Sequence, residues 1–161
     1  HLSKGLDTRA VNPHGNAKSV SAETTFSKNM KDAKALSSRL WPLCETVARR
    51  LKARDLAAKT VTLKLKTSGF QILTRSRSLA APTQLAEVLF RQARQLLDKE
   101  ADGRSFRLIG IGASGFAETE SADMPDLLDR RVETYAKVEN AMNAVREKFG
   151  APAIKKGRSL L

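Results

Sequence analysis

The sequence predicts an α+β fold in which a four-stranded sheet is covered on one face by two helices, in the order β-α-β-β-α-β, followed by a tail that contains a further helix. Four short segments alternate apolar and polar residues, as strands with one buried face do. Two longer segments repeat apolar residues every three or four positions, as amphipathic helices do. Each helix has a single apolar stripe, so both must cover a sheet; if both cover the same face, the other face stays open to solvent.

The first strand is predicted over residues 18–26, and the first helix begins at Asn29 or Asp32, either of which can cap it. The strand is rich in Val, Thr and Ser, and its weak apolar alternation suits an edge position. The apolar stripe of the helix consists of Leu36, Leu40, Leu43, Val47 and Leu51. Pro42 should kink or restart the helix, because proline removes one backbone hydrogen bond. We expect Trp41 to pack at this bend, the alternative being a base-stacking role.

The next two strands are predicted to form a hairpin over residues 59–79, with a turn at residues 67–69. The first arm alternates cleanly, so its apolar and polar side chains lie on opposite faces. Its apolar residues are Val61, Leu63 and Leu65, and its polar residues are Thr62, Lys64 and Lys66. The second arm, which begins at residue 70, carries Thr74, Arg75, Ser76 and Arg77.

Positive charge gathers on this hairpin. No acidic residue lies between Asp55 and Glu87, so the polar face of the hairpin cannot neutralise itself. We expect the open face of the sheet to present Lys64, Lys66, Arg75 and Arg77. A regular surface that carries such cations is typical of proteins that bind a nucleic-acid backbone. The alternative is an ordinary solvated surface.

A second helix and a fourth strand complete the predicted sheet domain. Thr83 is expected to cap a helix that ends near Asp98. Its apolar stripe consists of Leu85, Val88, Leu89, Leu96 and Leu97. The last strand is predicted over residues 106–116, with Ile109, Ile111 and Ala113 on one face and Leu108, Gly110 and Gly112 on the other. Glycine in a strand often marks the close approach of another backbone, and the spacing of these glycines matches no phosphate-binding loop.

The remaining residues differ in composition. Residues 117–129 contain acids and no cation, and within them Met124, Pro125, Asp126, Leu127 and Leu128 form a short linear motif. Two adjacent leucines in such a segment favour insertion into a pocket of a partner protein. A third helix is predicted over residues 130–149, ended by Gly150, and a basic tail follows it.

Length and charge set further bounds. The 161 residues suffice for one domain with an extension. The net charge of +12 is unevenly distributed, because residues 1–116 hold 21 Lys and Arg against 9 Asp and Glu, whereas residues 117–161 hold 8 against 8. The single cysteine, Cys44, falls among apolar helical residues and should be buried, without a disulfide or a Cys-based zinc site. The absence of a bilayer-spanning run or signal peptide predicts a cytoplasmic protein with no membrane partner.

Four segments resemble, in order and spacing, the C-terminal little finger domain of Y-family translesion DNA polymerases. They are residues 18–26, 61–66, 70–79 and 107–111. The resemblance divides the chain into the end of a thumb and a linker (1–17), the little finger domain (18–116), an acidic linker (117–129), and a C-terminal helix with a basic tail (130–161).

The resemblance implies that the open sheet lies in the DNA major groove and holds the phosphate backbones without reading sequence. The first strand would contact DNA partly through its main chain. Charge and resemblance together indicate Lys18, Ser19, Val20, Thr62, Lys64, Lys66, Thr74, Arg75, Ser76, Arg77, Arg107 and Leu108 as DNA-binding residues. Some relatives carry further arginines on the last strand where this chain has Leu108 and Gly112, so its grip there would depend more on close backbone approach.

Many members of this family also carry a peptide that binds the sliding clamp, commonly led by glutamine and containing a Leu-Phe or Leu-Leu pair. Residues 124–128 resemble a degenerate version of this peptide, with Met124 in the place of glutamine. The resemblance therefore implies the sliding clamp and primer–template DNA as partners.

No catalytic site is expected in this chain. Its acids are scattered, and His14 stands alone in a Pro/Gly segment. In the polymerases that the chain resembles, Mg²⁺ ions are held by palm carboxylates upstream, so we expect no cofactor here and no polymerase activity of this chain alone. Two functions remain open: a DNA-gripping fragment of a translesion polymerase that also docks on the clamp, and a stand-alone basic module that binds RNA or an acidic protein.

Overall fold

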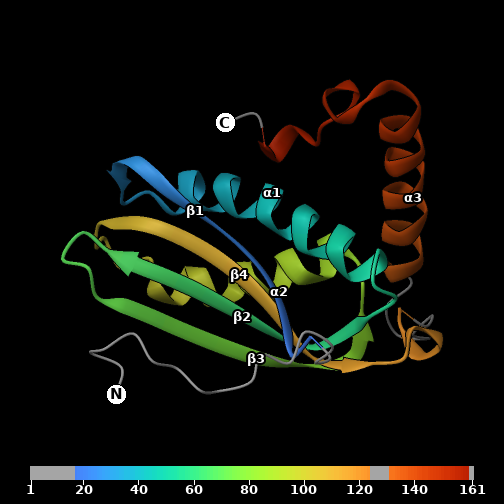
Figure 1. Ribbon diagram of the computed structural model, residues 1–161. Coiled ribbons are helices and arrows are strands. Elements are labelled where there is room, and N and C mark those ends of the chain that lie inside the picture. The colour runs from blue at the N-terminus through green and yellow to red at the C-terminus, as the bar shows by residue number, and fades with distance from the viewer. Residues whose placement is uncertain (1–16, 124–130, 160–161) are drawn as a thin grey trace, which may run out of the picture.

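The computed structural model describes residues 17–123 and 131–159, and the order of its elements confirms the predicted α+β fold (Figure 1). The sheet and its two helices comprise β1 (Ser19–Met30), α1 (Ala33–Lys52), β2 (Ala57–Thr67), β3 (Ile72–Thr83), α2 (Ala86–Glu100) and β4 (Phe106–Ala117). The chain continues through η2 (Thr119–Ser121), α3 (Arg131–Phe149), η3 (Ala151–Ala153) and η4 (Gly157–Ser159). The four strands form one antiparallel sheet in the order β1-β4-β2-β3, so β1 and β3 are its edges.

The two faces of the sheet differ as the alternation predicts. Residues that pair directly across an antiparallel ladder point to the same face. Leu63 of β2 pairs with Ile111 of β4, which in turn pairs with Ala22 of β1. This face holds the core, whose buried strand residues are Val20, Ala58, Val61, Leu63, Leu65, Phe106, Ile109, Ile111 and Ala113. The intervening residues project from the other face, which we call the open face.

Helices α1 and α2 both cover the core face, α1 over β1 and β4 and α2 over β2 and β3 (Figure 1). Asp32 caps α1, since its carboxylate accepts a hydrogen bond from the Ala35 amide at 2.6 Å. Helix α1 continues through Pro42, so a restart there is wrong, and the alternative, a kink, stays a prediction. Trp41 is buried and packs edge-on against Phe90 of α2, with ring centroids 5.3 Å apart, which excludes the base-stacking alternative.

The hairpin and the start of α2 differ from the prediction. Five residues, not three, separate the last paired residues Lys66 and Ile72, and Phe70 lies in the turn with a positive φ of 66°. Strand β3 continues to Thr83, and the N-cap of α2 is Leu85. The Thr83 hydroxyl instead accepts a hydrogen bond from the Leu85 amide at 3.0 Å. Pro82, next to the expected cap, lies in an irregular part of edge strand β3, where proline is tolerated.

Helix α3 and the tail pack on the side of α1 and α2, away from the open face (Figure 1). Glu139 of α3 binds Lys52 of α1 at 2.6 Å and accepts a hydrogen bond from the Ala86 amide at the start of α2. Farther along, Lys156 and Arg158 both bind Glu87, at 2.9 and 3.0 Å. The predicted helix over 130–149 is thus confirmed within one residue, and Gly150, with φ of 89°, follows it.

Candidate nucleic-acid interface

The open face is a grid of four strands by four rows of paired residues. From one end of the sheet to the other, in the strand order β1-β4-β2-β3, the rows are Ser19–Ser114–Thr60–Ser78, Ser21–Gly112–Thr62–Ser76, Glu23–Gly110–Lys64–Thr74 and Thr25–Leu108–Lys66–Ile72. Hydroxyl side chains occupy most of the positions. Each hydroxyl can donate one hydrogen bond, which suits an acceptor-rich surface such as a row of phosphates.

A hollow of about 250 Å³ lies in the middle of this grid, lined by residues of all four strands. Its floor is formed by Gly110 and Gly112 of β4. A Cβ atom on Gly110 would lie 2.8 Å from the Cβ of Glu23 and 3.3 Å from the carbonyl oxygen of Ala22. Glycine is therefore required at position 110 by the close approach of β1, as the sequence pattern predicted. At Gly112 a Cβ would find ordinary contacts of 3.8 Å, so only the depth of the hollow depends on glycine there.

The charge on the open face is smaller than the hairpin alone suggested. Lys64 and Lys66 project from it as predicted, but Glu23 of β1 binds Lys64 with an N–O distance of 2.8 Å. The polar face is thus not free of acids, which is a correction to the sequence interpretation. Both side chains are exposed to nearly half, and such surface pairs contribute only about 0.2–1 kcal/mol. A phosphate could therefore replace Glu23 as the partner of Lys64 at little cost.

Arg75 and Arg77 do not lie on the open face, and their predicted place there is wrong. Arg75 pairs with Leu63 and Arg77 with Val61, so both project from the core face at the β3 edge. Their partners are accordingly residues of α2: Arg75 Nε binds Glu100 Oε1 at 2.7 Å, and Arg77 donates to Gln95. Either arginine could contact a polyanion only around the β3 edge. Thr74 and Ser76, between them in sequence, do lie on the open face.

The other residues predicted to bind DNA lie in different parts of the sheet. Ser19, Thr62 and Leu108 lie on the open face, whereas the Val20 side chain is buried in the core, so only its main chain could bind a ligand. Lys18 directly precedes β1 and is exposed. Arg107 is the extra residue of a bulge in β4, because the neighbouring residues Phe106 and Leu108 pair with consecutive residues of β2. Its guanidinium lies 4.1 Å from the ring centroid of Phe70.

The free edge of β1 adds main-chain groups to the open face. Arg50 of α1 donates a hydrogen bond to the carbonyl oxygen of Ser21, so this carbonyl points away from β4. The N–H and C=O groups of one residue in an antiparallel strand point to the same side. The Ser21 amide therefore lies at the free edge too, as do those of Ser19 and Glu23, two positions away on either side. These amides are donors that no strand of the sheet pairs, so they are placed where they could make the main-chain contacts expected of this strand.

Several open-face residues were missed by sequence reasoning, namely Ser21, Glu23, Thr25, Thr60, Ser78 and Ser114. A signal for the β1 members was present, because Ser19, Ser21, Glu23 and Thr25 alternate with Val20, Ala22 and Thr24. The proximity of Glu23 to Lys64 had no such signal, since it depends on the strand order.

The described residues outside the open face contain no cluster of metal-ligating side chains. Among residues 17–123 and 131–159, no group of three or more His, Cys, Asp or Glu side chains could hold a metal ion. Cys44 is buried as predicted, and burial raises the pKa of its thiol well above the usual value. No helix in the described residues is long and apolar enough to cross a membrane.

A larger hollow of about 740 Å³ lies on the helix side, between α1, α3 and the tail. Its charged side chains largely neutralise one another, as in the pairs Lys52–Glu139 and Arg146–Glu45. It shares no residue with the hollow of the open face. The motif Met124, Pro125, Asp126, Leu127 and Leu128 lies outside the described residues.

Known sequences match most of the length of this chain. The model of the impB/mucB/samB family C-terminal domain matches residues 17–127. DNA polymerase IV of Brucella melitensis is 48% identical over 97% of this chain and 35% of the relative. DNA polymerase IV of Caulobacter vibrioides is 45% identical over 99% of this chain and 39% of the relative. The chain thus spans well under half the length of these relatives.

Solved structures share the fold. In the complex of the beta-clamp processivity factor with the little finger domain of PolIV, a chain at 26% identity gives a TM-score of 0.52, with 60% of this chain and 86% of that chain covered. The insertion ternary complex of Dbh DNA polymerase gives a TM-score of 0.53 at 16% identity, with 60% of this chain and 28% of that chain covered. The second likeness is one of fold alone.

Proposed function

The chain belongs to the impB/mucB/samB family C-terminal domains, the little fingers of Y-family DNA polymerases, and from this premise we propose that it holds primer–template DNA for a polymerase of the DNA polymerase IV type. The observation that carries the proposal is the open face itself. It combines hydroxyl groups, two lysines, a glycine-floored hollow and a strand edge whose amides pair with no other strand of the described sheet. All of these can bind phosphate oxygens.

The composition of the open face also supports binding that does not depend on base sequence. Specific readout of base edges is made mostly by bidentate side chains, Arg or Lys to guanine and Asn or Gln to adenine. The four rows of the grid contain no Arg, Asn or Gln and only two lysines, Lys64 and Lys66. Phosphate contacts position a protein on DNA and carry no sequence information. In this proposal the domain grips any primer–template equally, and catalysis belongs to parts of a polymerase that this chain does not contain.

The proposal is tested by fluorescence anisotropy of a labelled primer–template at several salt concentrations. Replacing Lys64 and Lys66 together by Gln should weaken binding on two unrelated sequences alike and reduce the slope of log K against log salt by about 2, because each lost phosphate contact removes roughly one unit. The matched control replaces Lys34 and Lys137, exposed lysines of α1 and α3, by Gln, with the same change in net charge.

Three results would contradict the proposal. Equal losses for the two lysine pairs would mean that net charge, and not the open face, decides binding. A loss confined to one DNA sequence would show base readout. Competition by RNA or an acidic protein as strong as that by DNA would favour the basic interaction module instead.

We also propose that residues 124–128 dock on a sliding clamp. The support is the Leu-Leu pair in an acidic segment and the likeness to the little finger that was solved with a beta clamp. Replacing Leu127 and Leu128 by Ala should abolish clamp binding, measured by surface plasmon resonance, and leave DNA binding unchanged. Replacing the other late pair, Leu160 and Leu161, is the matched control; loss of clamp binding there, with Leu127 and Leu128 dispensable, would assign docking to the C-terminal end.

A further inference from the structure

Phe70 is a large aromatic residue in an unfavourable place. It lies in the turn between β2 and β3, the residue is 60% exposed, and its φ of 66° falls in the left-handed region. A bulky side chain rarely adopts this conformation, because its Cβ comes too close to the backbone carbonyl. Neither burial nor local geometry accounts for the aromatic ring at this position. Residues held in such conformations cluster at functional sites.

The turn holds Phe70 firmly in this position. The Phe70 amide donates to the Thr67 carbonyl at 3.0 Å, and the Thr67 amide donates to the Gln71 carbonyl at 2.9 Å. The Ser68 amide donates to the carbonyl of Ser105, just before β4, at 2.8 Å. The turn is thus hydrogen-bonded both within itself and to a neighbouring loop. The ring is presented to solvent by a fixed backbone.

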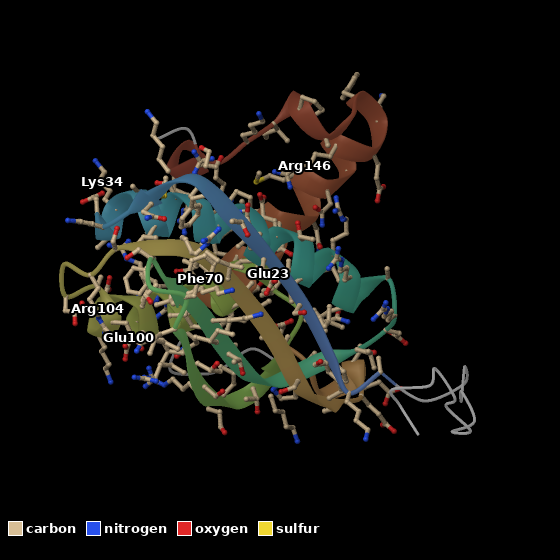
Figure 2. The ribbon with its side chains drawn as sticks, turned by 60° about the vertical axis from the view of Figure 1, so that its left-hand side comes forward. Glu23, Lys34, Phe70, Glu100, Arg104 and Arg146 are labelled. Atoms are coloured by element: carbon tan, nitrogen blue, oxygen red, sulfur yellow. The ribbon has the colours of Figure 1, made fainter. Side chains whose placement is uncertain are left out.

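Two cations lie at the ring, and both belong to strands of the sheet. The guanidinium carbon of Arg107 lies 4.1 Å and the Nζ of Lys66 lies 5.0 Å from the ring centroid. Lys66 is also part of the last row of the open face, next to Ile72, which is 58% exposed. In the view of Figure 2, Phe70 lies between Glu23 of the open face and the pair of Glu100 and Arg104. A cluster of Phe70, Arg107 and Lys66 therefore continues the open face at one end.

We propose that Phe70, with Arg107 and Lys66, is a stacking platform for an unpaired base where single-stranded DNA leaves the duplex on the open face. The proposal rests on the proposed function. An exposed aromatic ring beside cations is the arrangement by which proteins bind single-stranded nucleic acid without reading its sequence, because every base has a face that can stack. Lys66 links the platform to the phosphate-binding rows.

The chemistry of the cluster favours DNA over a protein partner. Glu100 is already bound by Arg75 and Arg104. An apolar protein surface placed on Phe70 would bury Arg107 and Lys66 without an opposing charge, which is costly. A strand of DNA supplies a base for the ring and phosphates for both cations. The guanidinium plane of Arg107 can itself stack on a base.

The test compares two labelled duplexes by anisotropy, one blunt and one with a single-stranded 5′ overhang. Phe70→Ala should weaken binding of the overhang duplex by roughly 5- to 100-fold, the usual cost of losing one aromatic stacking partner, and leave the blunt duplex unchanged. Phe149→Ala is the matched control, since Phe149 is also exposed, lies beside Lys148 and belongs to α3. It should change neither affinity.

Two further variants check the geometry. Phe70→Trp should keep the preference for the overhang, and its fluorescence should be quenched by the overhang duplex and not by the blunt one. Phe70→Gly should not lower Tm, because glycine adopts this φ without strain. A fall in Tm would show that the ring is kept for stability and would overturn the argument.

The outcomes separate this inference from the proposed function. If the unaltered chain binds both duplexes and Phe70→Ala changes neither or both equally, the platform is wrong and the open face stands. If the unaltered chain binds neither duplex, the proposed function fails, and the platform with it.

Discussion

Gly110 is the residue at which the open face tolerates no side chain. Strand β1 approaches so closely that a methyl group would press on both Glu23 and the Ala22 carbonyl, neither of which is a flexible chain end. Gly112, two residues away on the same face, has room for a methyl group. Substitution of Gly110 therefore tests folding, whereas substitution of Gly112 tests binding.

Gly110→Ala should lower the free energy of unfolding by about 1–3 kcal/mol, because the β1–β4 ladder must shift to admit the methyl group. Gly112→Ala should change it by no more than about 0.5 kcal/mol and should instead weaken DNA binding by roughly fivefold, the loss of about one hydrogen bond, by filling the hollow. Urea denaturation and anisotropy measure the two effects. Normal DNA affinity of a folded Gly112→Ala chain would show that the hollow is not used.

At the residue scale, the sequence predicted burial well and special conformations poorly. Leu36, Leu63 and Ile111 are buried because the apolar periods place them on the core side. The positive φ of Phe70 carried no sequence signal, since glycine at position 69 was the better candidate for a turn with that conformation. The partner of Lys64 depended on β1 and β2 flanking the same strand, which is a property of the tertiary fold.

At the scale of elements, the loop length of the hairpin decides on which face Arg75 and Arg77 lie. A hairpin loop with an odd number of residues pairs odd-numbered residues with odd-numbered ones. This holds for the predicted three-residue turn as well as for the five-residue turn observed. Arg75 and Arg77 therefore share a face with Val61 and Leu63 in either register, and the sequence already contained their place on the core face. Proximity in sequence to Lys64 and Lys66 therefore does not place a cation on the same face as these lysines.

The tail is an element whose contact with the helices can be measured directly. Lys156 and Arg158 lie 4.6 and 4.7 Å from the ring centroid of Trp41, and both bind Glu87, whose side chain is only 8% exposed. Burial alone would raise the pKa of Glu87, but the hydrogen bonds and charges of Lys156 and Arg158 outweigh it and hold the pKa below the usual 4.5. The ionised carboxylate thus fixes the tail over the only tryptophan of the chain.

Because the pKa of Glu87 is lower in the folded chain, the contact should be complete above pH 4.5 and should be lost as the pH falls through the lowered value. Trp41 fluorescence should report this loss as an acid transition. Glu87→Gln should abolish the transition and lower Tm by roughly 3–8 °C, since two cations lose a charged partner. Glu133→Gln is the control, because Glu133 also has a lowered pKa but lies on the exposed face of α3 beside Lys137. A transition that persists in Glu87→Gln would assign it to another group.

At the scale of the whole molecule, the open face and the tail lie on opposite sides of the sheet domain. The open face of the sheet is free of described segments, and the tail, α3 and the larger hollow lie beyond the helices (Figure 1). The sequence indicated this division through charge, since the excess of cations falls on residues 1–116. It could not indicate that the tail packs on α1 and α2, because the contacts join residues far apart in the chain, such as Glu87 and Lys156.

The central claim is that DNA lies on the open face, and NMR spectroscopy of the ¹⁵N-labelled chain titrated with a primer–template duplex tests it most directly. The account predicts the largest amide shifts at Ser19, Ser21, Lys64, Gly110 and Gly112, with the indole signal of Trp41 unchanged. Shifts concentrated at Trp41, Glu87 and the tail, with the glycines of β4 unaffected, would place the DNA on the helix side and contradict the account.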